Sequence, residues 1–82
     1  MTYAYTPSGV CSTKIDLSVE NGVIGSVSFT GGCSGNSQGI SRLVAGMDAD
    51  EAVRRLKGIK CGKRNTSCPD QLAKAIEESA KA

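Results

Sequence analysis

Apolar and polar residues alternate along residues 13–30, which is typical of two antiparallel strands with one buried face. The apolar positions are Ile15, Leu17 and Val19 on the first arm and Val23, Gly25, Val27 and Phe29 on the second. A two-residue Asn21–Gly22 turn would place these two rows on opposite faces. We therefore predict a three-residue loop at 20–22 that pairs Val19 with Val23. The hairpin covers about residues 10–31, and a short strand in residues 2–6 precedes it.

After residue 31 the apolar spacing changes to that of helices. A glycine-rich loop leads to a first helix, whose apolar side is formed by Ile40, Leu43, Val44 and Met47. Asp48 and Glu51 form a capping-box pattern before a second helix. A third helix begins at Cys68 and Pro69, with Leu72, Ile76 and Ala80 on its buried side. The sequence predicts an α+β fold, a small antiparallel sheet packed by two or three helices, in a single domain over residues 1–82.

Composition limits what this fold can do. The 82 residues are 39% hydrophobic but only 4% aromatic, so the core is small, and four cysteines are present without any histidine. A Cys–His nucleophile is excluded, and no obvious base activates a thiol or a serine. Neither a signal peptide nor a membrane span is recognisable, so we expect a cytoplasmic protein that does not enter membranes. In a reducing compartment, cysteines more often bind metal or carry out redox chemistry than form permanent bridges.

The cysteines are the candidate site. All-cysteine coordination suits zinc or iron, and the predicted ligands are Cys11, Cys33, Cys61 and Cys68. The hairpin brings Cys11 near Cys33, and we predict Cys68 as the N-cap residue of the last helix, where the helix dipole favours its thiolate. The spacing contains no C-x-x-C knuckle. Two alternatives remain: a thiol–disulfide relay between Cys61 and Cys68, and inert burial of the thiols.

Positive charge is concentrated in residues 54–64, which hold six of the ten lysines and arginines. One interpretation is a solvated helix face followed by a loop. The other is a contact for a protein partner, a nucleic acid or a nucleotide, and the residues proposed for it are Lys57, Lys60, Lys63 and Arg64.

The segments "GGCSGN", "GISRLVAG", "EAVRRLKGIKCG" and "TSCPDQLAKAI", with the early Cys11, resemble the TSCPD domain family. The family includes small four-cysteine proteins and a domain near the C-terminus of cobalamin-dependent ribonucleotide reductases. The resemblance implies metal or redox chemistry at the four cysteines, in an accessory module related to ribonucleoside-diphosphate reductase and to deoxyribonucleotide and DNA synthesis. It also implies a reductase or redox partner, because 82 residues are too few for the reductase barrel and its catalysis.

A second likeness is to iron–sulfur cluster assembly scaffolds, in the order of sheet, Gly-Cys loop, helix and a cysteine that opens the last helix. It implies a scaffold-like fold and a cluster carrier as a further alternative. This chain has Ser67 where the scaffolds have a histidine, and it has a fourth cysteine, which favours a closed site.

Overall fold

The computed structural model describes residues 2–10, 12–31, 34–60 and 65–81 of the chain. Three strands come first, β1 (Thr2–Tyr5), β2 (Ser12–Glu20) and β3 (Val23–Gly31). Three helices follow, α1 (Ser34–Val44), α2 (Ala49–Leu56) and α3 (Cys68–Lys81). The strands form one antiparallel sheet in the order β1-β2-β3. The predicted α+β fold is confirmed.

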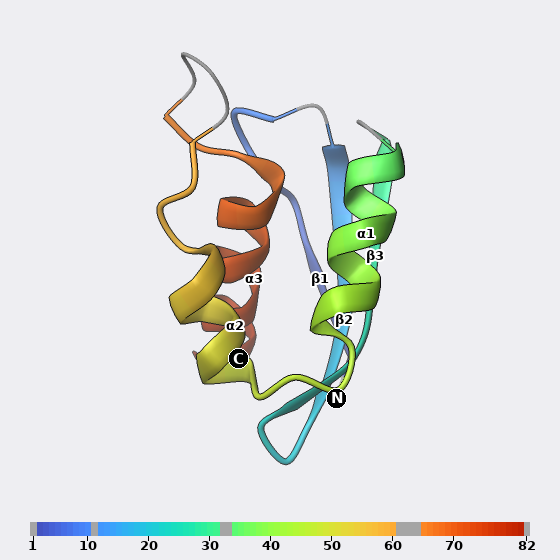
Figure 1. Cartoon of the computed structure of the whole chain (residues 1–82), viewed down its shortest axis with the longest axis vertical. Coiled ribbons are helices and arrows are strands. Elements are labelled where there is room, and N and C mark those ends of the chain that lie inside the picture. The colour runs from blue at the N-terminus through green and yellow to red at the C-terminus, as the bar shows by residue number, and fades with distance from the viewer. Residues whose placement is uncertain (1, 11, 32–33, 61–64, 82) are drawn as a thin grey trace.

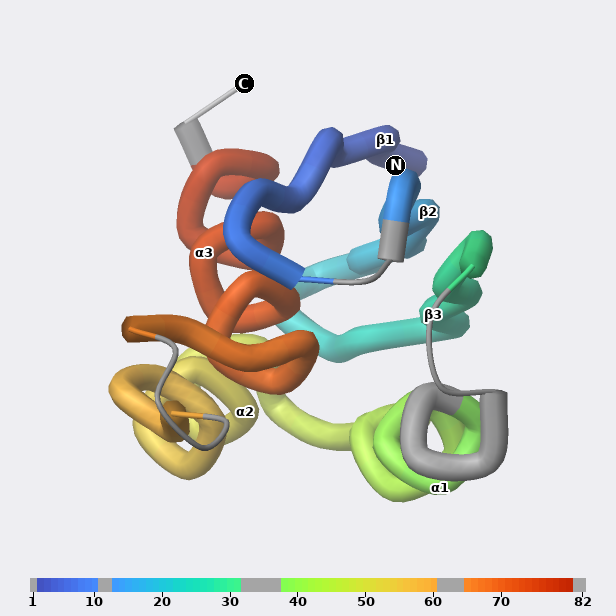
Figure 2. Tube along the Cα trace, turned by 90° about the horizontal axis from the view of Figure 1, so that it is seen from above, coloured from blue at the N-terminus to red at the C-terminus, as the bar shows by residue number. Residues whose placement is uncertain are grey.

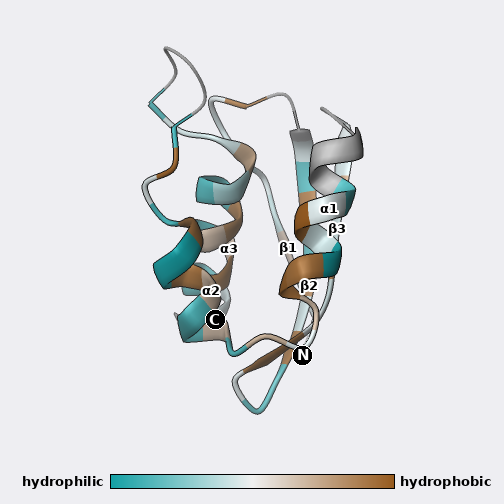
Figure 3. Ribbon diagram, viewed as in Figure 1, coloured by the Kyte–Doolittle hydropathy of each residue, from teal (hydrophilic) through white to brown (hydrophobic). Residues whose placement is uncertain are grey.

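The helices cover one face of this sheet (Figures 1 and 2). Helix α1 packs on β3, whereas α3 packs on β1 and β2 and carries α2 on its side. The core between the sheet and the helices is a cluster of nearly fully buried residues: Ile15, Leu17, Ile24, Val44, Ala52, Leu72, Ala75 and Ile76. Figure 3 shows apolar residues on the inward sides of α1 and α3 and hydrophilic residues on the outer side of α2. No helix in the described residues is long and apolar enough to cross a bilayer.

The hairpin register differs from the prediction. Asn21 and Gly22 form a two-residue turn with φ of 52° and 78°, and Glu20 pairs with Val23. Two positive φ values are typical of the type I′ turn that suits a right-handed strand twist. The predicted three-residue loop is therefore wrong, and so is the pairing of Val19 with Val23.

The two apolar rows still share a face because a β-bulge follows the turn. Val19 pairs with Ile24, but Ser18 pairs with Ser26, so Gly25 is the extra residue. After the bulge, Leu17 faces Val27 and Ile15 faces Phe29. The bulge also places Ile24 in the core with no exposed surface, while Val23 keeps 42% of its surface exposed. The inward residue at this end is thus Ile24, where the sequence pattern predicted Val23 and Gly25.

Helix α1 begins earlier than predicted. The glycine-rich segment from Ser34 onward is helical, where the sequence favoured a loop, and the helix ends at Val44 before Gly46, whose φ is +83°. Met47 therefore lies beyond the helix. Leu43 is 76% exposed and takes no part in the buried side that its spacing predicted. Packing against β3 supports the helix despite its glycines, as tertiary contacts often override propensity.

Substitution of Gly25 tests whether the β-bulge is assigned correctly. A Cβ at this position would lie 2.7 Å from Ser18 Oγ, an atom already held because it accepts the Ser26 N–H. We predict that Gly25→Ala lowers the free energy of unfolding by about 1–3 kcal/mol, measured by urea denaturation.

Gly39 supplies the matched control, since a Cβ there has no neighbour within 4 Å and the residue lies inside α1. Gly39→Ala should raise the free energy of unfolding by about 0.5–1 kcal/mol. Equal effects of the two substitutions would contradict the assigned register.

Candidate functional site

Of the four predicted metal ligands, the structure describes Cys68. It is the first residue of α3 and is half-buried. Cys11, Cys33 and Cys61 lie outside the described residues. Within the described part of the chain, no group of three cysteine or acidic side chains is placed to hold a metal ion. The structure does describe residues that flank each cysteine, and their contacts show how those parts of the chain are arranged.

The N-cap residue of α3 is Ser67 and not Cys68. Ser67 Oγ accepts the Asp70 N–H at 3.2 Å, and its carbonyl oxygen accepts the first helical bond, from the Gln71 N–H at 2.8 Å. The same hydroxyl donates to the Ile59 carbonyl at 2.7 Å. A serine hydroxyl is a much better cap than a thiol because it forms stronger hydrogen bonds of suitable geometry. Cys68 is thereby shifted one position into the helix.

Asp70 is the first of two buried polar centres behind this cap. Its side chain is almost fully enclosed, and one carboxylate oxygen accepts the Gly58 N–H at 2.7 Å. The other oxygen accepts the Thr66 hydroxyl and lies 3.9 Å from Lys74 Nζ. Asp70 thus joins the chain just after α2 to the first turn of α3.

These contacts decide the ionisation of Asp70. Burial by itself raises the pKa of the carboxyl group. The hydrogen bonds from Thr66 and Gly58, and then the charges of two lysines, outweigh burial, so the pKa lies below its ordinary value of 3.8. The folded protein therefore holds Asp70 as a carboxylate at neutral pH.

Gln71 is the second buried centre, with 1% of its surface exposed. Its Oε1 accepts the Ser8 N–H at 3.1 Å and the Tyr5 hydroxyl at 3.5 Å. Its Nε2 donates to Thr66 Oγ1 at 2.9 Å, and the Thr66 hydroxyl in turn donates a hydrogen bond to the Asp70 carboxylate. A backbone N–H can only donate, so the contact with Ser8 fixes which end of the Gln71 amide is the oxygen. We call Thr66, Ser67, Asp70 and Gln71 the polar clamp.

The polar clamp gathers the chain segments that flank three cysteines. Ser8 lies three residues before Cys11, Ile59 lies two before Cys61, and Thr66 lies two before Cys68. A Cβ on Gly9 would lie 3.0 Å from Thr66 Cγ2, so the first and third segments are in contact.

The fourth flank joins them through the sheet. Ser12, next to Cys11, pairs with Gly31, two residues before Cys33. All four flanks lie at the end of the fold that is uppermost in Figure 1.

Only part of the basic segment can be placed. Arg54 and Arg55 both donate hydrogen bonds to Glu51. These bonds lower the pKa of Glu51, and the bond from Arg55 has the largest effect. Lys57 Nζ lies 3.0 Å from Glu77, and Lys60 is exposed. Lys63 and Arg64 lie outside the described residues. The arginines on α2 fit the solvated helix face that was the simpler interpretation of this charge run.

Sequence reasoning missed Ser67, Thr66 and Gln71 as structural residues. A signal for the first was present, because Ser67 and Asp70 stand three apart before an apolar helix, which is a capping-box pattern. Nothing in the pattern indicates that Gln71 reaches Ser8, since that contact spans 63 residues and depends on the fold.

Asp70→Asn tests the polar clamp. Asparagine keeps the shape of the side chain but replaces one acceptor oxygen with an NH2 donor. Asp70 accepts hydrogen bonds at both oxygens, from the Gly58 N–H and the Thr66 hydroxyl, so the variant must lose one of these two acceptors. We predict a loss of about 1–3 kcal/mol in the free energy of unfolding at neutral pH. Because the folded pKa is lowered, the contribution of Asp70 is complete above about pH 4 and is lost as pH falls through the folded pKa. The variant should therefore lose stability less steeply in acid, as measured by urea unfolding across pH.

Asp50→Asn is the control, an exposed aspartate in the first turn of α2. Its effect should stay within about 0.5 kcal/mol. A similar, small effect of both substitutions would show that the Asp70 contacts contribute little.

Comparison with known proteins bears on these residues directly. A model of the TSCPD domain matches residues 1–80, which include the five-residue run Thr66–Asp70 that contains most of the polar clamp. No curated protein and no solved structure matches the chain. The resemblance inferred from the sequence is thereby confirmed, while the likeness to iron–sulfur scaffolds stays a prediction. The chain belongs to the TSCPD domain family.

Proposed function

We propose that this domain is a metal-binding accessory module that holds zinc or iron through Cys11, Cys33, Cys61 and Cys68. The observation that carries the proposal is the gathering of the four flanking segments at one end of the fold. Ser8 is hydrogen-bonded to Gln71, Gly58 to Asp70, and Ser12 is paired with Gly31. Buried hydrogen bonds are costly to break, so these segments stay together whether or not metal is present.

The chemistry of the donors supports a closed site. When bound, a metal with four thiolates supplies folding energy and leaves no open position for substrate. The chain's own part is to hold the ligand-bearing segments in place. A bound metal would be valuable here, because the described core cluster has only eight buried aliphatic residues and small domains often need an additional crosslink.

The proposed partner is based on the family resemblance. The sequence resemblance connects TSCPD domains with ribonucleotide reductases, so we propose a reductase or redox protein as the partner, with nucleic acid or a nucleotide as the other class of ligand. Lys57, Lys60, Lys63 and Arg64 are the proposed contacts. The ion pair of Lys57 with Glu77 is exposed and contributes little energy, so it leaves Lys57 able to exchange partners.

The proposal is tested on protein purified without oxygen. We expect a stoichiometric amount of zinc or iron by elemental analysis and four thiols that react with a thiol reagent only after chelation. Removal of the metal should lower the melting temperature. Cys68→Ser should weaken metal binding strongly, whereas Ser79→Ala, a buried serine in the same helix, should leave it unchanged. Four freely reactive thiols and no bound metal would overturn the proposal.

A second candidate is the thiol–disulfide relay. Gly58 and Ile59 are bonded to Asp70 and Ser67, so the segment before Cys61 is held against the helix that starts with Cys68. In this role the two thiols would reduce a partner disulfide and become joined to each other. A fold that is indifferent to chelators, with a reversible Cys61–Cys68 disulfide of defined potential, would select the relay. A visible chromophore after anaerobic reconstitution would select the cluster carrier.

A further inference from the structure

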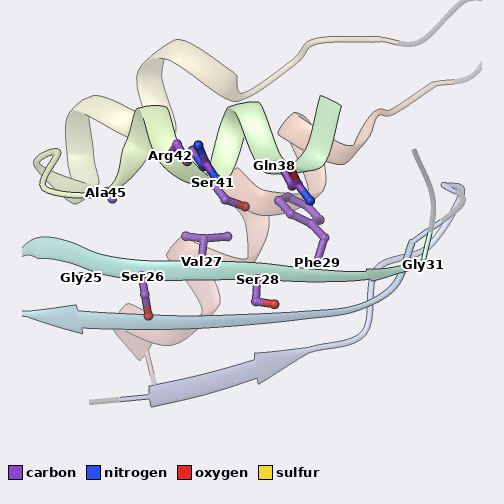
Figure 4. Close-up of a pocket in the computed structure, with 10 residues that line it drawn as sticks. All are labelled: Gly25, Ser26, Val27, Ser28, Phe29, Gly31, Gln38, Ser41, Arg42 and Ala45. Carbon is purple, nitrogen blue, oxygen red and sulfur yellow. The ribbon is translucent and has the colours of Figure 1, made fainter. Parts of the chain in front are cut away.

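A groove runs along the outer edge of β3, beside α1. Its volume is about 510 Å³, and one wall is a continuous stretch of β3 from Gly25 to Phe29. The other wall is formed by Gln38 and Arg42 on the flank of α1 and by Ala45, which directly follows the helix (Figure 4). Residues from both faces of the strand line the groove, since Val27 and Phe29 point toward α1 and Ser26 and Ser28 point away. The groove is therefore open to the backbone edge of the strand.

The chain itself already adds a short strand to this edge at one end. The Ile24 N–H donates to the Met47 carbonyl at 2.9 Å, and the Ile24 carbonyl accepts the Gly46 N–H at 2.7 Å. Val23 forms an antiparallel bridge with Asp48. Among the described residues, no other segment pairs with the outer edge of β3. The edge is thus capable of antiparallel pairing, and the described part of the chain uses it only as far as Ile24.

The described residues that line the groove carry one charged side chain, that of Arg42. No residue of β3 from Val23 to Gly31 is charged, although exposed edge strands are usually protected by charges, proline or a cover. Arg42 is the charged residue on the groove wall, it is exposed, and no acidic side chain among the described residues pairs with it. Figure 4 places Arg42 above Val27. A neutral strand edge beside one cation suits an extended peptide with one negative group.

We propose that this groove binds the extended C-terminal segment of another protein as an added antiparallel strand, with its terminal carboxylate beside Arg42. Strand addition to an edge beside a helix is a recurring mode of peptide recognition. The direction follows from the chain. A strand antiparallel to β3 ends near Gly25, because residues 46–48 occupy the edge beyond it. Its last residue therefore falls between Gly25 and Val27, below Arg42.

A second copy of this chain fits the groove less well. Paired strands lie about 4.8 Å apart, whereas packed helices need about 8–10 Å. Since α1 packs on β3, pairing β3 with β3 of a second copy would force two α1 helices together. It would also bring two Arg42 side chains together and leave both without an anion. A peptide strand without its own helix avoids both conflicts.

The test uses a short fluorescent peptide that alternates valine and threonine and ends in a free carboxylate, titrated into the intact protein. We expect saturable binding by fluorescence anisotropy, with amide shifts in the NMR spectrum at residues 25–31. Amidation of the peptide C-terminus and Arg42→Glu should each weaken binding about tenfold or more, because a charge-assisted hydrogen bond is lost. Methylation of alternate peptide nitrogens should abolish binding.

The matched control is Arg54→Glu, which makes the same substitution at an exposed arginine on α2, away from the groove. It should bind the peptide normally, and circular dichroism should show that both variants are folded. Binding that survives nitrogen methylation would overturn strand addition, and binding unaffected by amidation would overturn the assigned direction. A dimer of the free protein with protected amides at residues 25–31 would show that a second copy occupies the groove, and would also overturn the proposal.

Discussion

The structure depends on two buried polar side chains, Asp70 and Gln71, at the start of α3. A buried carboxylate or amide is costly when any of its atoms lacks a partner, so such groups fix their surroundings strongly. Asp70 is satisfied only if Gly58 and Thr66 are close, and Gln71 only if Ser8 is close. Three segments distant in sequence are therefore held at one end of a fold whose aliphatic core is small.

This arrangement explains what the run "TSCPD" does apart from its thiol. Ser67 caps the helix, Thr66 connects the two buried centres, and Asp70 holds the chain that leaves α2. Cys68 lies in the middle of these contacts, at the first residue of α3. The polar residues position the segments near the cysteines, and the cysteines are left to do the chemistry that we propose. In this proposal, the structural and the chemical roles fall on neighbouring residues of one motif.

Much of the fold could be predicted from sequence because it depends on local pattern. Alternation gave the three strands, and Asp48 with Glu51 marked the start of α2, where Asp48 does accept the Glu51 N–H. The register was wrong because parity can be restored either in the turn or by a bulge, and alternation does not distinguish the two. The local hints were the Asn21–Gly22 pair, which is typical of a two-residue turn, and Gly25 inside the strand. The contact of Gln71 with Ser8 could not be predicted, since it exists only after α3 has packed on the sheet.

The central claim is that the polar clamp holds separate segments together, and amide hydrogen exchange tests it most directly. The Ser8 and Gly58 N–H groups lie in irregular segments, yet each donates to a side chain of the polar clamp. The account predicts that both are protected, and that they open together with the first turn of α3 as one cooperative unit. Exchange of both amides at the rate of an unfolded chain, while α3 stays protected, would contradict it.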